Sequence, residues 1–323
     1  MNLVWRVLVL GGAAFGLSSK HLQPRSSSTR LFDSTLTAVK PKDYTTIPLQ
    51  ELLSGAQQRG VTAKMPTGLK NKYFGLRHGE STANLEGIIS SDLKVGSTTH
   101  GLTPEGRGQA RRAAVDLISL IGRESLLEPD KVVLVSSPFT RARETAAEAL
   151  SAMSKVIAFE NEVYGAATPP LKGSKWIIPS PVDRCVLLQE CDLDMSVEMG
   201  LPDVPVVIND KLRERFFGEF DAKPLIWYNR VWPYDQVDAL NTRHGVESVD
   251  EVCRRCASLI QELEQQYQDK VVVFSSHADT LQIFQLFMSG VVDPRFFADY
   301  RFRNGEARNM LSLQAQRVHM VYR

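Results

Sequence analysis

Apolar and polar residues alternate in two patterns along the chain. Short runs rich in β-branched and aromatic residues predict buried strands at 72–77, 131–136 and 270–275. Apolar positions at helical spacing predict helices at 103–121, 141–153, 247–268 and 279–288. The strand runs lack polar alternation, which is typical of strands covered on both faces. The pattern predicts an α/β fold, a three-layer sandwich with a mostly parallel central sheet covered by helices on both faces.

Local signals mark where some of these elements begin and end. The helix at 103–121 opens with Thr103 as a cap, Pro104 at its first position and Glu105 in its first turn. Near the carboxyl end, apolar residues at 311–313 and 318–322 predict two closing strands. A short helix is the most that the pattern supports before residue 70, around 49–53.

The amino terminus has the composition of a targeting segment. Residues 1–32 contain no Asp or Glu, and the short apolar run at 7–17 is followed by a basic, Ser-rich stretch. The combination resembles the two-part plastid presequences of algae, in which a Phe, here Phe15, follows the signal cleavage point. We therefore predict a presequence at 1–35 and a location in an organelle, with the plastid favoured over the mitochondrion and the secretory pathway.

The rest of the chain divides at a change of texture near residue 70. Residues 36–69 are polar, with scattered Pro, Gly and Thr, and predict an extension that lies against the following domain. Apart from the short helix around 49–53, every strand and helix pattern lies in residues 70–323, which predict one catalytic domain. Within it, the stretch at about 155–210 contains several Pro and an acidic run, and it predicts an insertion that acts as a lid or is a surface excursion.

Composition limits the partners. The chain has 38 basic and 37 acidic residues and a formal charge of +1, so no overall basic field points to nucleic acid. The apolar run at 7–17 is too short to span a bilayer, which predicts no stable membrane insertion. The four cysteines are Cys185, Cys191, Cys253 and Cys256. Free thiols are favoured over structural zinc, and a disulfide between Cys185 and Cys191 stays open.

Residues suited to phosphate chemistry follow the predicted strands. Arg77 ends the first strand and His78 follows it. Arg141 lies shortly after the second strand, and His277 lies two residues after the third. In parallel sheets, ligands bind beyond the carboxyl ends of the strands, so these side chains should converge. A neutral imidazole can attack phosphorus with one nitrogen when its other nitrogen is held by an acceptor, while arginines hold the phosphoryl oxygens.

Five ordered blocks then carry a resemblance to a known family. They are RHGESTAN at 77–84, HGLTPEGRGQA at 100–110, SSPFTRARETA at 136–146, LRERFFGEF at 212–220 and SSHADTL at 275–281. In this order they resemble the signature of the histidine phosphatase superfamily, also called phosphoglycerate mutase-like. The resemblance covers residues 72–281 and implies that family's fold.

The resemblance implies a role for each matching residue. His78 would be the nucleophile that becomes phosphohistidine. Arg77, Arg141 and His277 would bind the phosphoryl group and stabilise charge on its oxygens, and Asn84 would help to hold the phosphate. Structural alternatives exist for two of these residues. Arg141 can form an ion pair one helical turn along, and His277 can cap the helix that follows it.

The proton donor is placed by the same resemblance at Glu214. It would give a proton to the leaving alkoxide and then take one from the attacking water. Charged residues surround this position in the sequence, namely Arg213, Arg215 and Glu219. Asp279, two residues after His277, is a reserve candidate for the acid. The family requires no cofactor and no metal, and neither is predicted here.

The predicted activity is metal-independent hydrolysis of a phosphomonoester, on a small phosphorylated metabolite. Phosphoglycerate mutases share the machinery, but they carry a Trp where this chain has Ala83 and an Arg pair where it offers Arg230. Both differences favour hydrolysis over mutase-type phosphoryl transfer. A phosphorylated protein substrate and a non-catalytic phosphate-binding regulator are further alternatives. The regulator predicts a missing nucleophile, acid or arginine, and none is missing.

Overall fold

The fold is described from a computed structural model that covers residues 59–122, 125, 131–164, 206–291, 293, 296 and 300–313. The predicted presequence at 1–35, most of the extension and most of the insertion lie outside these residues. So do Cys185, Cys191 and the predicted strand at 318–322. The interpretations of those segments, including the plastid location, stay predictions.

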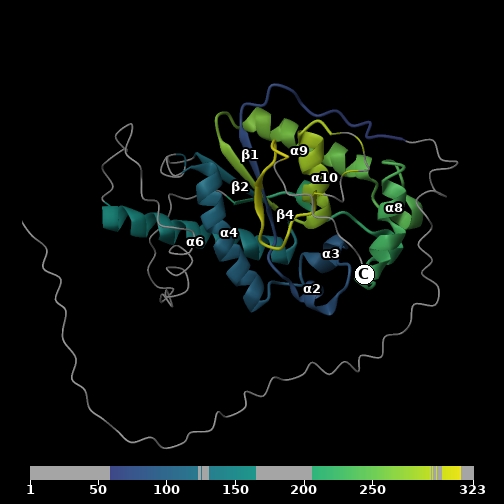
Figure 1. Ribbon diagram of the computed structural model, residues 1–323, viewed down its shortest axis with the longest axis horizontal. Helices are drawn as coiled ribbons and strands as arrows, with labels where there is room; N and C mark the ends of the chain where they lie inside the picture. The colour runs from purple at the N-terminus through teal and green to yellow at the C-terminus, as the bar shows by residue number, and fades with distance from the viewer. Residues whose placement is uncertain are drawn as a thin grey trace, which may run out of the picture. The chain divides into compact units, whose positions relative to one another are not determined.

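One sheet organises the described residues (Figure 1). Its strands lie in the order β3-β2-β4-β1-β5. The strands β1 to β4 are parallel to one another, and the edge strand β5 runs antiparallel to its neighbour β1. The strands are β1 (Lys72–Arg77), β2 (Val132–Ser136), β3 (Val206–Ile208), β4 (Val271–Ser276) and β5 (Ala307–Asn309). The predicted mostly parallel sheet is confirmed.

Helices cover both faces of this sheet. On one face, alternate strand residues such as Phe74 and Leu134 pack with α4 (Pro104–Ile121) and α6 (Thr140–Tyr164). On the other face, Tyr73 and Phe274 stack at 5.6 Å between ring centroids and pack with α9 (Val249–Gln266) and α10 (Ala278–Met288). In Figure 1, α4 lies to the left of the strands and α10 to their right. The predicted three-layer sandwich is confirmed.

The cap predicted for the helix at 103–121 is confirmed, and a second cap, which was not predicted, opens α9. Thr103 accepts a hydrogen bond from the backbone N–H of Gly106, and Pro104 opens α4. Ser248 and Glu251 form a reciprocal capping box at the start of α9. Helix α6 continues to Tyr164, well past the predicted end at 153.

One predicted strand is wrong. The segment at 311–313 is irregular, and the strand that pairs with β1 is β5, a few residues earlier. Its middle residue is Arg308, and a charged residue type does not indicate a buried strand. The guanidinium can be buried because its N–H groups have partners. It donates to the carbonyls of Tyr300 and Arg301, and it lies 4.1 Å from the ring centroid of Phe302.

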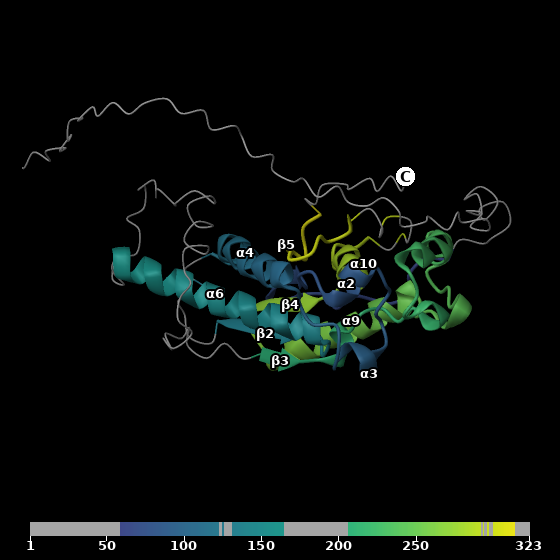
Figure 2. The ribbon, with the colours of Figure 1, turned by 90° about the horizontal axis from the view of Figure 1, so that it is seen from below.

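Several short elements were not predicted. Between β3 and α9 the chain forms single turns whose positions depend on side-chain contacts. These are η1 (Asp210–Leu212), η2 (Gly218–Phe220), η3 (Leu225–Arg230), α8 (Trp232–Asp235) and η4 (Arg243–Gly245). Helices α2 (Thr82–Glu86) and α3 (Leu93–Gly96) are equally short. Figures 1 and 2 both place the α8 region at one end of the sandwich, beyond α10.

The described end of the extension, 59–69, is bonded to the domain. The amide of Ala239 donates to the carbonyl of Arg59 at 2.8 Å, and the carboxylate of Asp250 accepts the amide of Ala63 at 2.9 Å. Asp250 lies in the first turn of α9. The same helix carries Cys253 and Cys256, which are both buried free thiols. None of the helices in the described part of the chain is long and apolar enough to cross a bilayer.

Candidate functional site

Two histidines meet at the carboxyl edge of the sheet. His78 follows β1 and His277 follows β4, and the last residues of these neighbouring strands, Arg77 and Ser276, are register partners. The imidazole rings lie 5.2 Å apart between centroids at an angle of 60°. Residues that are about 200 positions apart in the sequence are therefore brought into one site by strand pairing alone.

His78 is held in one tautomer. Its Nδ1 lies 2.7 Å from the carbonyl oxygen of Gly79, which can only accept, so Nδ1 carries the proton. Its Nε2 accepts from Nε of Arg141 at 3.2 Å and presents a lone pair. Burial, followed by the charges of Arg141 and Arg77, holds the pKa of His78 well below its usual range. The imidazole is neutral at pH 7, and its unprotonated nitrogen is Nε2, the one that faces Arg141.

Arg77 and Arg141 bring two buried cations to this edge. Nη1 of Arg77 donates to the carbonyl of Phe302 at 2.7 Å, while its Nε has no hydrogen-bond partner among the described residues. Arg141 donates to Ser90 through both terminal nitrogens and lies 4.8 Å from the ring centroid of Phe139. Burial lowers the pKa of each arginine to about 10, so both stay protonated at neutral pH. Since neither guanidinium has an ion-pair partner among the described residues, an anion can meet these charges without displacing a carboxylate of that part of the chain.

His277 occupies the N-cap position of α10, but its side chain makes no capping hydrogen bond. The ring instead lies 2.8 Å from Oγ of Ser137 through Nε2, and it meets the Phe139 ring edge-on at 4.8 Å between centroids. Its Nδ1 is buried without a partner in the described part of the chain. An unpaired buried nitrogen next to His78 is suited to contact a phosphoryl oxygen.

Asn84 is also near the loop that carries His78, and its amide oxygen is fully engaged. That oxygen accepts from the amide and the hydroxyl of Ser81 at 3.0 and 3.1 Å and from Nδ2 of Asn304 at 3.2 Å. Asn304 also donates to the carbonyl of His78 at 3.3 Å. Any hydrogen bond from Asn84 to phosphate therefore falls to its amide nitrogen.

Glu214 is buried at the same edge. Its Oε1 accepts from the amide of Arg215 at 2.9 Å and from the amide of Thr280 at 3.3 Å. Burial, followed by the negative charge of Asp279, raises the pKa of Glu214, and the positive charges of Arg141 and Arg77 oppose this rise. A carboxyl group with a raised pKa can carry a proton near neutral pH.

Asp279, the reserve candidate for the acid, is engaged in other contacts. Its Oδ2 accepts from Nε1 of Trp232 at 3.0 Å, and its Oδ1 accepts from Nε2 of Gln282 at 3.0 Å. Oδ2 also lies 3.8 Å from the buried guanidinium of Arg215. The geometry gives Asp279 an electrostatic influence on Glu214 and favours Glu214 as the proton donor.

The structure adds residues that the sequence did not single out. Ser137 holds the ring of His277, Ser90 holds the guanidinium of Arg141, and Asn304 holds the carbonyl of His78. Ser137 falls inside the block at 136–146, so its place just after β2 was the available signal. Ser90 and Asn304 lie in irregular segments that no pattern marks. Among the described residues, no group of three or more His, Cys, Asp and Glu is placed to hold a metal ion.

Comparison with known proteins identifies one family and a set of similar folds. The family model described as histidine phosphatase superfamily (branch 1) matches residues 74–163 and 194–319, more than half of the chain. No curated protein matched the chain.

Three similar solved structures illustrate the fold. A mycobacterial glucosyl-3-phosphoglycerate phosphatase has 18% identity and a TM-score of 0.47 over 73% of this chain and 88% of its own. A phosphoserine phosphatase from Entamoeba histolytica has 18% identity and a TM-score of 0.45 over 73% and 88%. A putative α-ribazole-5′-phosphate phosphatase from Escherichia coli has 18% identity and a TM-score of 0.43 over 76% and 89%.

Proposed function

The chain belongs to the histidine phosphatase superfamily, and from this premise we propose that it hydrolyses phosphomonoesters through a phosphohistidine on His78. One observation carries the proposal. The buried imidazole of His78 is fixed with its proton on Nδ1, facing the carbonyl of Gly79, and with Nε2 facing the guanidinium of Arg141. This is the protonation state and orientation that a nitrogen nucleophile needs to attack phosphorus.

In the first step, Nε2 of His78 attacks phosphorus while the bond to the ester oxygen breaks. Arg77, Arg141 and Nδ1 of His277 contact the equatorial oxygens, where charge accumulates. Nε of Arg141 now points at His78 and would turn to the incoming phosphoryl group. Glu214 gives its proton to the leaving oxygen, so that the alcohol departs neutral.

In the second step, water attacks the phosphorus of the phosphohistidine. Glu214, now a carboxylate, takes a proton from that water, the N–P bond breaks and inorganic phosphate leaves. His78 returns to the neutral form with its proton still on Nδ1. The raised pKa of Glu214 supports both roles, because the carboxyl group then keeps its proton to higher pH and its carboxylate takes a proton back more readily.

The depth of the site favours a small substrate. The side chains that would meet the phosphoryl group are almost fully buried, with relative exposures of 7% for Arg77, 3% for His78 and 3% for Arg141. A small metabolite ester reaches such a site more easily than a phosphorylated residue on a folded protein. Ala83 and the lone Arg230, in place of the residues that mutases carry, favour water as the acceptor over a second substrate hydroxyl.

The test is phosphate release by the full-length chain from para-nitrophenyl phosphate and a panel of metabolite phosphates, in EDTA, beside His78→Ala. We expect release that the variant lacks, and an acid-labile, base-stable phosphoenzyme from labelled substrate in the wild type alone. A folded His78→Ala protein with wild-type turnover would refute the proposal. A mutase would move the phosphoryl group between hydroxyls without net release. A regulator would bind esters and release nothing.

A further inference from the structure

The amide and hydroxyl of Thr280 meet the loop that carries Glu214 at two points. Its amide donates to Oε1 of Glu214 at 3.3 Å. Its hydroxyl donates to the carbonyl of Arg213 at 2.8 Å, since a carbonyl oxygen can only accept. The first contact fixes one end of the carboxyl group and the second fixes the backbone directly before it. Thr280 is in the first turn of α10, a helix that is buried along its whole length.

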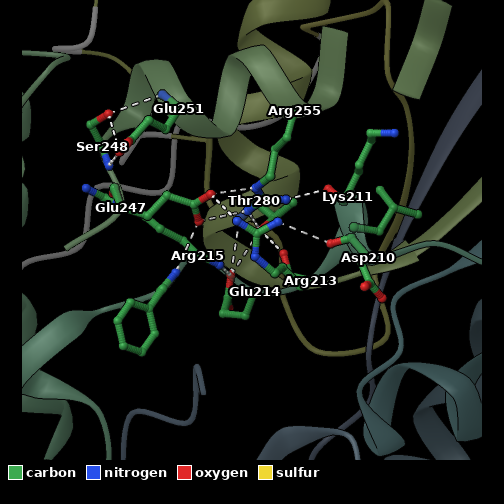
Figure 3. A network of polar contacts seen from close by, with 12 residues as sticks. Asp210, Lys211, Arg213, Glu214, Arg215, Glu247, Ser248, Glu251, Arg255 and Thr280 are labelled. Carbon is green, nitrogen blue, oxygen red and sulfur yellow. Dashed lines mark hydrogen bonds and ion pairs between the residues drawn. The ribbon is translucent and has the colours of Figure 1, made fainter. Parts of the chain in front are cut away.

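The direction of the Thr280 hydroxyl is itself set by Arg255. Nη2 of Arg255 donates to Oγ1 of Thr280 at 3.2 Å, which occupies a lone pair and leaves the hydroxyl hydrogen for Arg213. Arg255 is held in turn by Glu247, with Nε at 2.8 Å from Oε1, and by the carbonyl of Lys211. Figure 3 shows these side chains as one network between α9 and the loop of Glu214.

This network leaves one end of the Glu214 carboxyl group for chemistry. Oε1 receives the amides of Arg215 and Thr280 and lies 3.3 Å from the Thr280 hydroxyl. An oxygen that accepts two N–H donors behaves as the carbonyl end of a protonated carboxyl group, so the proton belongs on Oε2. A proton donor is effective only when it is held to within a fraction of an ångström of the position from which it can reach its acceptor.

We propose that Thr280, oriented by Arg255, is the positioning residue that holds Glu214 for proton transfer to the leaving group. Thr280 need not touch substrate in this role. The inference rests on the proposed function, because it assigns Thr280 a part in the step in which Glu214 protonates the departing alcohol. It also explains why a hydroxyl-bearing, β-branched residue occupies a fully buried position beside the site.

The experiment exploits how much each leaving group needs a proton. Nitrophenolate is a good leaving group and departs with little help, whereas an alkoxide departs only when it is protonated. We would measure kcat/KM of the full-length chain for para-nitrophenyl phosphate and for glycerol 1-phosphate, because kcat/KM reports steps up to formation of the phosphoenzyme. The variants are Thr280→Val, which keeps the shape but not the hydroxyl, and Thr280→Ser, which keeps the hydroxyl.

We expect Thr280→Val to lower the ratio of the glycerol 1-phosphate value to the nitrophenyl value by about 10- to 100-fold, part of what a general acid contributes. Thr280→Ser should restore most of that ratio. If Thr280→Val does not fold, Thr280→Ala tests the same loss, and turnover of the nitrophenyl ester reports a folded site.

Three results would overturn the inference. The first is an equal loss on both esters, which indicates a general structural defect. The second is an unchanged ratio, and the third is a Thr280→Ser protein as impaired as Thr280→Val. A wild-type chain that forms no phosphoenzyme with either ester would instead overturn the proposed function, and this inference would fail with it.

Discussion

Two glycines of α4 that are two residues apart in the sequence should change the stability of the fold in opposite directions when each is replaced by Ala. A Cβ on Gly106 would lie 2.0 Å from the carbonyl oxygen of Glu80, a backbone atom in the loop that follows His78. A Cβ on Gly108 would meet only Nη1 of Arg112, at 3.4 Å, an ordinary contact with the end of a flexible side chain. Gly106→Ala and Gly108→Ala are therefore a matched pair.

The magnitudes follow from helix propensity and overpacking. Replacing Gly by Ala inside a helix is intrinsically favourable by about 1 kcal/mol, so Gly108→Ala should stabilise the fold by roughly that amount. At Gly106 the helix and the loop must separate by about 1 Å, and overpacking of this kind costs about 1–3 kcal/mol or more when backbone must move. The loop is tied to α4 by the amide of Thr103, which donates to the carbonyl of Glu80 at 3.0 Å. The loop cannot move without disturbing that hydrogen bond.

The same displacement reaches the nucleophile. Glu80 follows Gly79, whose carbonyl fixes the tautomer of His78, so a shift of about 1 Å in this loop should cost on the order of 100-fold in kcat/KM. Urea unfolding and kcat/KM for para-nitrophenyl phosphate on both variants check the reasoning. If Gly106→Ala is as stable and as active as Gly108→Ala, the close packing of helix on loop does not support the site, and the argument fails.

Three further outcomes follow from buried groups. Because the pKa of His78 is held well below its usual range and that of Glu214 is raised, kcat/KM should fall at low pH, below the range in which a histidine usually titrates, as His78 gains a proton, and it should fall with rising pH as Glu214 loses one. Glu214→Gln should abolish the alkaline fall in a pH series, and its persistence would contradict the assignment. Arg215→Met should lower the free energy of unfolding by about 3–5 kcal/mol in urea, since it strands buried Asp235; a loss near zero would contradict this. Cys256 is buried and its pKa is raised to about 12, so iodoacetamide should label it only after unfolding, as mass spectrometry would show.

Elements with strong local signals were predictable from the sequence. The strands β2 and β4 each begin with four consecutive apolar residues, and α4 and α9 carry their capping residues in the sequence, Thr103 and Ser248. The meeting of His78 with His277 was also predictable, because parallel neighbouring strands bring their carboxyl ends together. Each of these inferences used a rule that needs only a few consecutive residues.

Elements that depend on particular side-chain contacts were not predictable. β5 is hidden by Arg308, whose charge is neutralised by carbonyls and by Glu306 rather than by solvent. The single turns between β3 and α9 are fixed by contacts such as the stacking of Tyr228 on Trp232, at 4.6 Å between ring centroids. The pattern of apolar and polar residues indicates neither contact, because it records which residues are apolar and not which side chains meet.

Glu214 shows most clearly why local sequence misleads at this site. Its neighbours in the chain, Arg213 and Arg215, place charge on both sides of it in the sequence. In the fold their guanidinium groups bond elsewhere, Arg213 to Glu247 at 2.7 Å and Arg215 to buried Asp235 at 2.7 Å. Adjacent residues of an extended segment point to opposite sides, so the side chain between them faces a different environment. The groups that set the protonation of Glu214 come instead from α10, α6 and the end of β1. Apart from the amide of Arg215, the groups that shift the pKa of Glu214 are therefore far from it in the sequence.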